Sequence, residues 1–148
     1  MISRDTVAAI DVAGGRVIGV EIAGAGTQTT LRAGHYVLAA GAWTEALARP
    51  LGLRIATRPV RGQIVLLRPP RRVLGSVVSR RLDYLVPRDD GTLLVGSTLE
   101  DAGFDADTTP SAVERLRTLA RDLLGAAGEA PVEQAWAGLR PGSADGLP

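Results

Sequence analysis

One long helical pattern, in a chain otherwise made of short apolar runs, is the sequence feature that most constrains the fold. Thr109 is a suitable N-cap, and Pro110 fits the first position of a helix. Gly125 or Gly128 can end it. The apolar residues between these limits recur every three or four positions, so they form one stripe that we predict to cover a face of a sheet. The stripe consists of Val113, Leu116, Ala120, Leu123, Leu124 and Ala127.

The sheet is expected from apolar runs bounded by turn residues. Asp89, Asp90 and Gly91 mark a tight turn between two of these runs, which therefore form a hairpin. The predicted strands after residue 55 are residues 57–68, 73–79, 83–87 and 92–98, followed by one that begins at Val132 and reaches a turn at Pro141 and Gly142.

The first 50 residues have a different pattern of apolar runs. Residues 7–12 and 16–22 form a predicted hairpin, and residues 29–33 form a third strand. Residues 36–40 are a continuous apolar run, typical of a strand buried in a parallel sheet, and residues 42–48 resemble a short helix. A strand that passes through a glycine into a helix is a common ligand site in α/β sheets, although a plain connection has the same pattern. The fold class we predict is α+β, an antiparallel sheet with a covering helix plus a remnant of an α/β layer.

Composition excludes several kinds of site. The chain has 148 residues, a net charge of +1 and no cysteine, and all 17 of its Lys and Arg residues are arginine. Without lysine there is neither a Walker phosphate loop nor a Schiff base. His35 is the single histidine and has no nucleophile motif near it, so we expect no metal site and no catalytic triad.

Charge and apolar patterning also limit the partners. A net charge near zero does not favour a nucleic acid or an anionic membrane. The first 15 residues lack the pattern of a signal peptide, and no apolar run approaches the ~18 residues that span a bilayer. We expect a cytoplasmic protein.

Residues 136–142 place an arginine where a strand is expected to end. Gly138 and Gly142 remove side-chain bulk around Arg140, and Pro141 favours an extended backbone before it. A guanidinium in such a position can bind a carboxylate through two parallel hydrogen bonds. The local pattern is equally that of a surface arginine.

Five segments, taken together, resemble a known family. They follow one another in the family's order over nearly the whole chain, and they are residues 37–43, 58–63, 84–88, 95–100 and 136–148. On these residues the chain resembles FAD-dependent amino acid oxidases, in particular the glycine oxidase branch of the D-amino acid oxidase group. Sarcosine oxidases and D-amino acid dehydrogenases are close alternatives.

The resemblance implies a function and a division of the chain. Enzymes of this kind transfer a hydride from the substrate α-carbon to FAD, after which the imine hydrolyses and oxygen reoxidises the flavin with formation of hydrogen peroxide. The family's GxGxxG unit and its C-terminal flavin-contacting segment are missing here, so we expect an internal fragment. By resemblance, residues 1–52 are a remnant of the FAD-binding domain, residues 53–140 the substrate-binding domain, and residues 141–148 the return to the first.

The resemblance also assigns roles to individual residues. Arg140 matches the arginine that binds the substrate carboxylate, Tyr84 matches a tyrosine that holds the same group, and Leu99 matches an apolar residue of the side-chain pocket. Val7, Ala40 and Gly41 match positions close to FAD. No catalytic acid or base is implied, because the flavin carries the difficult step. We expect Arg58 and Arg61 to be structural or surface residues.

A non-enzymatic hypothesis remains open. Without the nucleotide loop, this chain could be an inactive, self-associating binding domain, because a strand at residues 36–40 would present an apolar edge to a second copy. In that case we expect a homo-oligomer and no tight binding of FAD.

Overall fold

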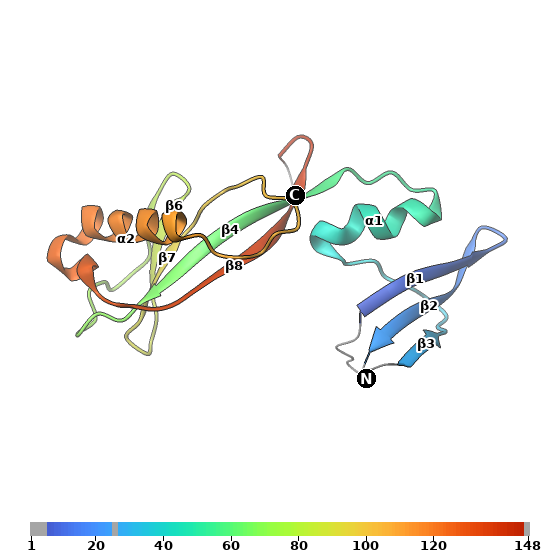
Figure 1. Ribbon diagram of the computed structural model, residues 1–148, viewed down its shortest axis with the longest axis horizontal. Coiled ribbons are helices and arrows are strands. Elements are labelled where there is room, and N and C mark those ends of the chain that lie inside the picture. Colours follow the sequence, from blue (N-terminus) through green and yellow to red (C-terminus); the bar gives the residue numbers. More distant parts are fainter. Residues whose placement is uncertain (1–5, 25–26, 147–148) are drawn as a thin grey trace. The chain divides into compact units, whose positions relative to one another are not determined.

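The computed structural model describes residues 6–24 and 27–146 and divides the chain into two compact units (Figure 1). One unit comprises residues up to 58 together with those from 141 onward, and the other comprises residues 59–140. Each unit is described by itself below.

The first unit contains a three-stranded antiparallel sheet in the order β1-β2-β3. Its strands are β1 (Thr6–Ala13), β2 (Arg16–Gly24) and β3 (Thr27–Leu31). Gly14 and Gly15 join the first two strands with φ angles of 57° and 73°, a backbone that a tight hairpin turn requires and that glycine adopts without strain. The predicted hairpin and third strand are confirmed.

The predicted buried strand at residues 36–40 is wrong. These residues form no strand, and the side chain of Val37 is 90% exposed. A buried parallel strand needs hydrogen-bonding neighbours, and none of the described strands pairs with this run. The short helical segment after it is confirmed, as η1 (Gly41–Trp43), α1 (Thr44–Ala48) and η2 (Arg49–Leu51).

The second unit is built on a five-stranded sheet in the order β5-β6-β7-β4-β8. Figure 1 shows the two longest strands, β4 and β8, running side by side. The strands are β4 (Thr57–Leu67), β5 (Val78–Arg80), β6 (Asp83–Pro87), β7 (Leu93–Gly96) and β8 (Val132–Ser143).

Two predicted strand limits were wrong. Only the end of the expected strand at residues 73–79 pairs, as β5, because Val73 and Leu74 pack against the core from an irregular segment instead. Strand β8 continues through Pro141 and Gly142. Proline is tolerated there because β8 is an edge strand, where one side of the backbone needs no partner.

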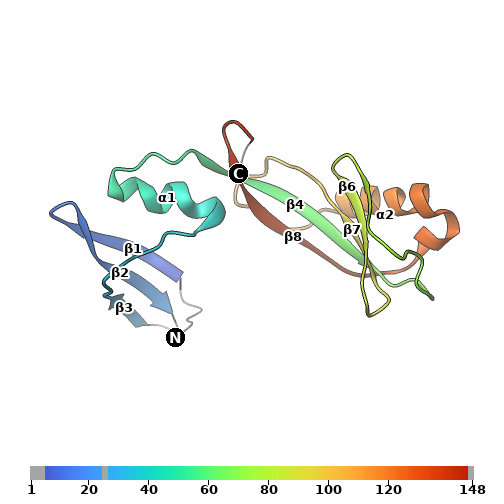
Figure 2. The same ribbon diagram turned by 180° about the vertical axis from the view of Figure 1, so that it is seen from behind.

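Helix α2 (Pro110–Leu124) covers one face of this sheet, as predicted (Figures 1 and 2). Leu116, Leu119 and Ala120 of the helix pack into the core. Their partners alternate along the strands and are Val65, Leu67, Leu85, Leu93 and Val95. Helix α2 is followed by η3 (Gly125–Glu129). The strand residues that alternate with the core partners of α2 belong to the opposite, open face of the sheet. They are Ile64, Leu66, Tyr84, Leu94 and Gly96.

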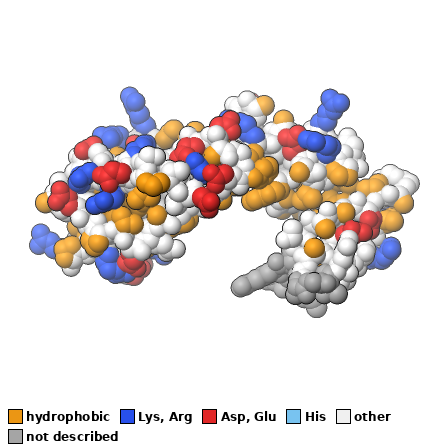
Figure 3. Space-filling model, viewed as in Figure 1, with side chains coloured by type: hydrophobic (Ala, Val, Ile, Leu, Met, Phe, Trp, Pro, Cys, Tyr) orange, Lys and Arg blue, Asp and Glu red, His pale blue; other side chains and the backbone are white. Residues whose placement is uncertain are grey.

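The surface charges, the length of the helices and the arrangement of metal-binding side chains bear on the kinds of ligand and partner. On the face drawn in Figure 3, acidic and basic side chains are interspersed. None of the helices in residues 6–24 and 27–146 is long and apolar enough to cross a membrane. Over the same residues, no cluster of His, Cys, Asp or Glu side chains is arranged to hold a metal ion.

Candidate functional site

Two glycines on the open face of the sheet leave room for two polar side chains. A Cβ atom at Gly62 of β4 would lie 2.6 Å from Cζ of Arg140. A Cβ atom at Gly96, the last residue of β7, would lie 2.6 Å from the hydroxyl oxygen of Tyr84. The guanidinium and the phenol therefore occupy the space that side chains at these two positions would fill.

The register of the strands brings the two side chains to one place. Gly96 pairs with Ile64 of β4 and with Tyr84 of β6. Gly62 is two residues from Ile64, so it lies on the same face and about 7 Å away along the strand. The guanidinium and the phenol therefore lie over nearby positions on the same face of the sheet.

Among the described residues, the acceptors that hold the Arg140 side chain are both neutral. Its Nη2 donates to Oγ of Ser97 at 2.8 Å, and its Nη1 donates to the carbonyl oxygen of Thr98 at 3.4 Å. The residue is half-buried, and no acidic side chain of residues 6–24 and 27–146 forms an ion pair with it. Its Nε–H group also has no partner among those residues, so the cation keeps donors for an anionic ligand.

Tyr84 also keeps a free functional group. It is half-buried in β6, and its hydroxyl forms no hydrogen bond with any residue in the described ranges. A phenol can donate to a carboxylate that a nearby guanidinium has neutralised. Of the sequence-predicted site residues, Arg140 and Tyr84 therefore lie over two glycines on the same face of the sheet.

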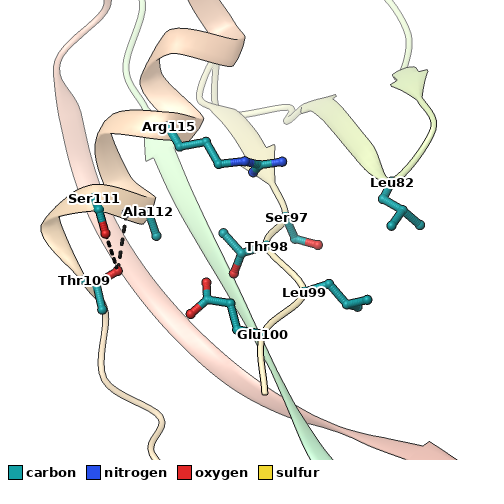
Figure 4. A pocket seen from close by; sticks show the side chains of 9 residues that line it. All are labelled: Leu82, Ser97, Thr98, Leu99, Glu100, Thr109, Ser111, Ala112 and Arg115. Carbon is teal, nitrogen blue, oxygen red and sulfur yellow. Dashed lines mark hydrogen bonds between the residues drawn. The ribbon is translucent and has the colours of Figure 1, made fainter. Parts of the chain in front are cut away.

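Leu99 lines a pocket of about 430 Å³. Figure 4 shows residues from the start of α2 on one side of this pocket, with Leu82 and Leu99 on the other. Leu99 is 64% exposed. Ser97 also lines the pocket, so the segment after β7 borders both the pocket and the guanidinium.

A buried polar network fixes the segment that holds Arg140. Arg61 donates from Nε and Nη2 to Oε2 of Glu100, at 3.0 and 2.7 Å, and from Nη1 to Asp105 at 2.6 Å. Nε2 of Gln63 donates to both oxygens of Glu100, and Oε1 of Gln63 accepts from the backbone N–H of Thr109. Arg61 is 7% exposed, so of the two expectations, a structural or a surface residue, its burial agrees with the first.

Sequence reasoning did not single out three members of this region, Gln63, Ser97 and Glu100. One signal was available for Gln63, since it alternates with Val65 and Leu67 and so faces the helix-covered side of the sheet. A polar residue at such a position needs buried partners. For Ser97 and Glu100, the sequence contains no comparable periodic signal.

The network also keeps Glu100 ionised. Burial raises the pKa of its carboxyl group. Hydrogen bonds with Thr98, Arg61 and Gln63 lower the pKa by more than burial raises it, so the resulting pKa lies below the ordinary value. The same pairing, led by the hydrogen bond to Glu100, raises the pKa of Arg61. The charges of this pair therefore persist at neutral pH.

The positions predicted to lie near FAD are all in the first unit. Val7 pairs with Ile22 in β1 and is 38% exposed. Ala40 and Gly41 lead into η1, and space around Gly41 is open, with no atom within 4 Å of an added Cβ. Among the described residues there is no glycine-rich turn between a strand and a long helix, so the cradle that a pyrophosphate requires is not formed by them.

Comparison with known proteins places the chain in a family. The family profile described as FAD dependent oxidoreductase matches residues 1–148. The chain is 46% identical over 134 residues to a glycine oxidase of Pseudomonas putida, an alignment that covers 90% of this chain and 36% of that protein. It is 36% identical over 140 residues to a D-amino acid dehydrogenase of Cereibacter sphaeroides, covering 93% and 31% of the two chains.

A solved structure gives the same result. The fold matches that of glycine oxidase from Geobacillus kaustophilus with a TM-score of 0.83 and 30% identity, over 97% of this chain and 38% of that one. The chain thus spans between 31% and 38% of the length of these relatives. The resemblance and the fold class expected from the sequence are confirmed, and the chain belongs to the FAD-dependent oxidoreductase family.

Proposed function

We propose that this chain carries the substrate-binding site of an FAD-dependent amino acid oxidase that acts on glycine or another small amino acid. The observation that supports the proposal most directly is the guanidinium of Arg140, which lies on the open face of the sheet beside Tyr84 without an acidic partner among the described residues. A half-buried cation held only by neutral acceptors is suited to bind a carboxylate.

The proposed chemistry of this chain is orientation. Arg140 would accept the carboxylate through two parallel hydrogen bonds, and the Tyr84 hydroxyl would donate a further one. These hydrogen bonds would hold the α-carbon of the substrate in a defined position relative to the sheet. Positioning of this kind lowers a reaction barrier by several kcal/mol. When bound, FAD supplies the hydride acceptor. Leu99 would contribute to the surface near the substrate's side chain.

The two units would have different tasks. In the proposed arrangement, residues 53–140 form the substrate-binding domain, while residues 1–52 and 141–148 belong to the FAD-binding domain. Val7, Ala40 and Gly41 would contact FAD, and the pyrophosphate site would come from elsewhere in a longer enzyme. We therefore expect only weak FAD binding by this chain alone.

The test is a substitution at Arg140 in the flavin-loaded enzyme to which we propose this chain belongs. Arg140→Ala removes the charge-assisted pair, at a cost of about 2–5 kcal/mol, so KM for the amino acid rises at least about thirtyfold. Arg71→Ala, which removes an exposed arginine, is the matched control. An unchanged KM for every amino acid tried would reject the proposed site.

The identity of the electron acceptor separates the alternatives within the family. Glycine, sarcosine and D-alanine should be compared, with peroxide formation measured beside reduction of an artificial dye. Peroxide formation supports an oxidase, whereas turnover with the dye alone supports a D-amino acid dehydrogenase.

Self-association and a cytoplasmic location are further parts of the proposal. Several large apolar side chains of the first unit are exposed, among them Val37, Leu53 and Ile55. Exposed apolar surface favours association with a second copy. Light scattering at high concentration should then detect a dimer or larger species, and a monomer would argue against it.

A further inference from the structure

Ser97 is the residue that holds the end of the Arg140 side chain. Its hydroxyl accepts a hydrogen bond from Nη2 of Arg140 at 2.8 Å, and the residue is only 8% exposed. A hydroxyl this buried has few alternative partners, so the contact is a defined one.

The backbone on both sides of Ser97 is anchored. Gly96 lies in the sheet between Tyr84 and Ile64. Thr98 donates its backbone N–H to the carbonyl oxygen of Gln63 at 3.3 Å, and its Oγ1 accepts from the N–H of Gln63 at 2.9 Å. Because both neighbours are fixed to adjacent strands, the backbone at Ser97 is fixed as well, and the hydrogen bond with Arg140 orients its hydroxyl.

The chemical character of the acceptor matters as much as its position. Arginine has a long, flexible side chain that loses conformational freedom when it is held. A carboxylate at position 97 would hold it too, but it would neutralise the cation and compete with an anionic ligand. A hydroxyl orients the guanidinium and leaves its charge available.

We propose that Ser97 is a positioning residue for carboxylate recognition, acting through Arg140. This inference rests on the proposed function, since it concerns the same site. The serine preorganises the guanidinium, so that the substrate carboxylate meets an oriented pair of N–H donors.

The test is a set of substitutions at position 97 in the flavin-loaded enzyme. For Ser97→Ala we expect KM for the amino acid to rise about fivefold with kcat nearly unchanged, because binding loses one hydrogen bond to a charged group. Ser97→Thr keeps the hydroxyl and should restore KM. Ser97→Asp should raise KM about a hundredfold or more, because it supplies a competing carboxylate. Ser79→Ala, in exposed strand β5, is the control.

The Arg140→Lys background separates positioning from a general structural effect. Lysine cannot reproduce the fork of donors, so adding Ser97→Ala to Arg140→Lys should raise KM no further. If Ser97→Ala fails to fold, Ser97→Cys provides the same test, because a thiol fills nearly the same volume and is only a weak hydrogen-bond acceptor.

The possible outcomes lead to distinct conclusions. If Arg140→Lys raises KM and Ser97→Ala does not, the role of Ser97 is rejected while the proposed function stands. If neither substitution changes KM, both are rejected. A KM effect of Ser97→Ala that persists in the Arg140→Lys background also overturns the inference, because the serine would then act independently of the guanidinium.

Discussion

At the scale of single residues, the candidate site depends on two glycines, which have no side chain. At Gly62 and Gly96, the sheet accommodates a guanidinium and a phenol because no Cβ atoms occupy that space. The Arg140 guanidinium is then held by hydrogen bonds to Ser97 and Thr98. The smallest residues of the sheet therefore determine where the largest polar groups lie.

This arrangement predicts the effect of Gly62→Ala. The added methyl group would overlap the guanidinium of Arg140, which is the movable end of a flexible side chain. We expect the fold to survive, while displacement of the guanidinium from Ser97 raises the KM for the substrate by about tenfold or more. Steady-state kinetics and thermal unfolding measure the two effects separately.

Gly138→Ala is the matched control for this prediction. Gly138 lies in β8, two residues before Arg140, and an added Cβ there would have no atom within 4 Å. Its KM should remain that of the parent enzyme. Equal KM values for the two glycine variants would contradict the proposed crowding at Gly62.

At the scale of secondary structure, the start of α2 is tied to the strand that carries Gly62. Thr109 caps the helix by accepting from the N–H of Ala112 at 3.3 Å. Its own backbone N–H donates to Oε1 of Gln63 at 2.7 Å, and its hydroxyl lies 3.2 Å from Nε2 of the same side chain. One residue thus ends a loop, begins a helix and attaches both to β4.

Thr109→Ala should lower the free energy of unfolding by about 1 kcal/mol or somewhat more, because the helix loses its N-cap. Urea denaturation followed by circular dichroism measures this change. Thr109→Ser keeps the capping oxygen and should cost much less. Thr108→Ala, at the exposed neighbouring position, serves as the control, and a loss equal to that of Thr109→Ala would show that the cap is not responsible.

At the scale of the whole molecule, folding lowers the pKa of several carboxyl groups. Hydrogen bonds from Thr92 lower that of Asp90, and Arg68 lowers that of Glu133. The backbone N–H of Asp107, with Arg61, lowers the pKa of Asp105. In Glu100, the hydrogen bonds described above outweigh the effect of burial.

These pKa shifts determine whether the stability of the fold rises or falls with pH. A carboxyl group with a lowered pKa in the folded state binds fewer protons there than in the unfolded chain, so its contribution to stability rises with pH. That contribution is fully present above the ordinary value, which is 4.5 for Glu100, and it is lost as the pH falls through the lowered value. We therefore expect Tm to be constant near neutrality and to fall below about pH 5.

Glu100→Gln tests this assignment. The variant should be less stable than the parent at pH 7, since Arg61 loses one of its two carboxylate partners and keeps only Asp105. Its Tm should fall less between pH 6 and pH 3. Glu129→Gln, which removes an exposed carboxylate, is the control. If Glu100→Gln and the parent lose Tm in parallel over this range, Glu100 does not contribute to the acid sensitivity.

The local patterns were sufficient to predict many of the elements. The cap at Thr109, the stripe on α2, the glycine turn after β1 and the turn before β7 all depend on residues close together in the sequence. The predictions were wrong where a run of apolar residues was expected to form a strand that pairs with a neighbouring strand. Val37 lacks a neighbouring strand, and Val73 and Leu74 bury their side chains without one.

The sequence by itself determined the α+β class, the covering helix and, through the order of its motifs, the family. It also pointed to Arg140 as a carboxylate-binding candidate, a role that remains a prediction. Only the tertiary structure decided that Arg140 lies over Gly62, that Tyr84 lies over Gly96 and that Ser97 holds the guanidinium. The physical reason is that strand pairing sets these contacts between residues up to about 78 positions apart, through a register that no local pattern contains.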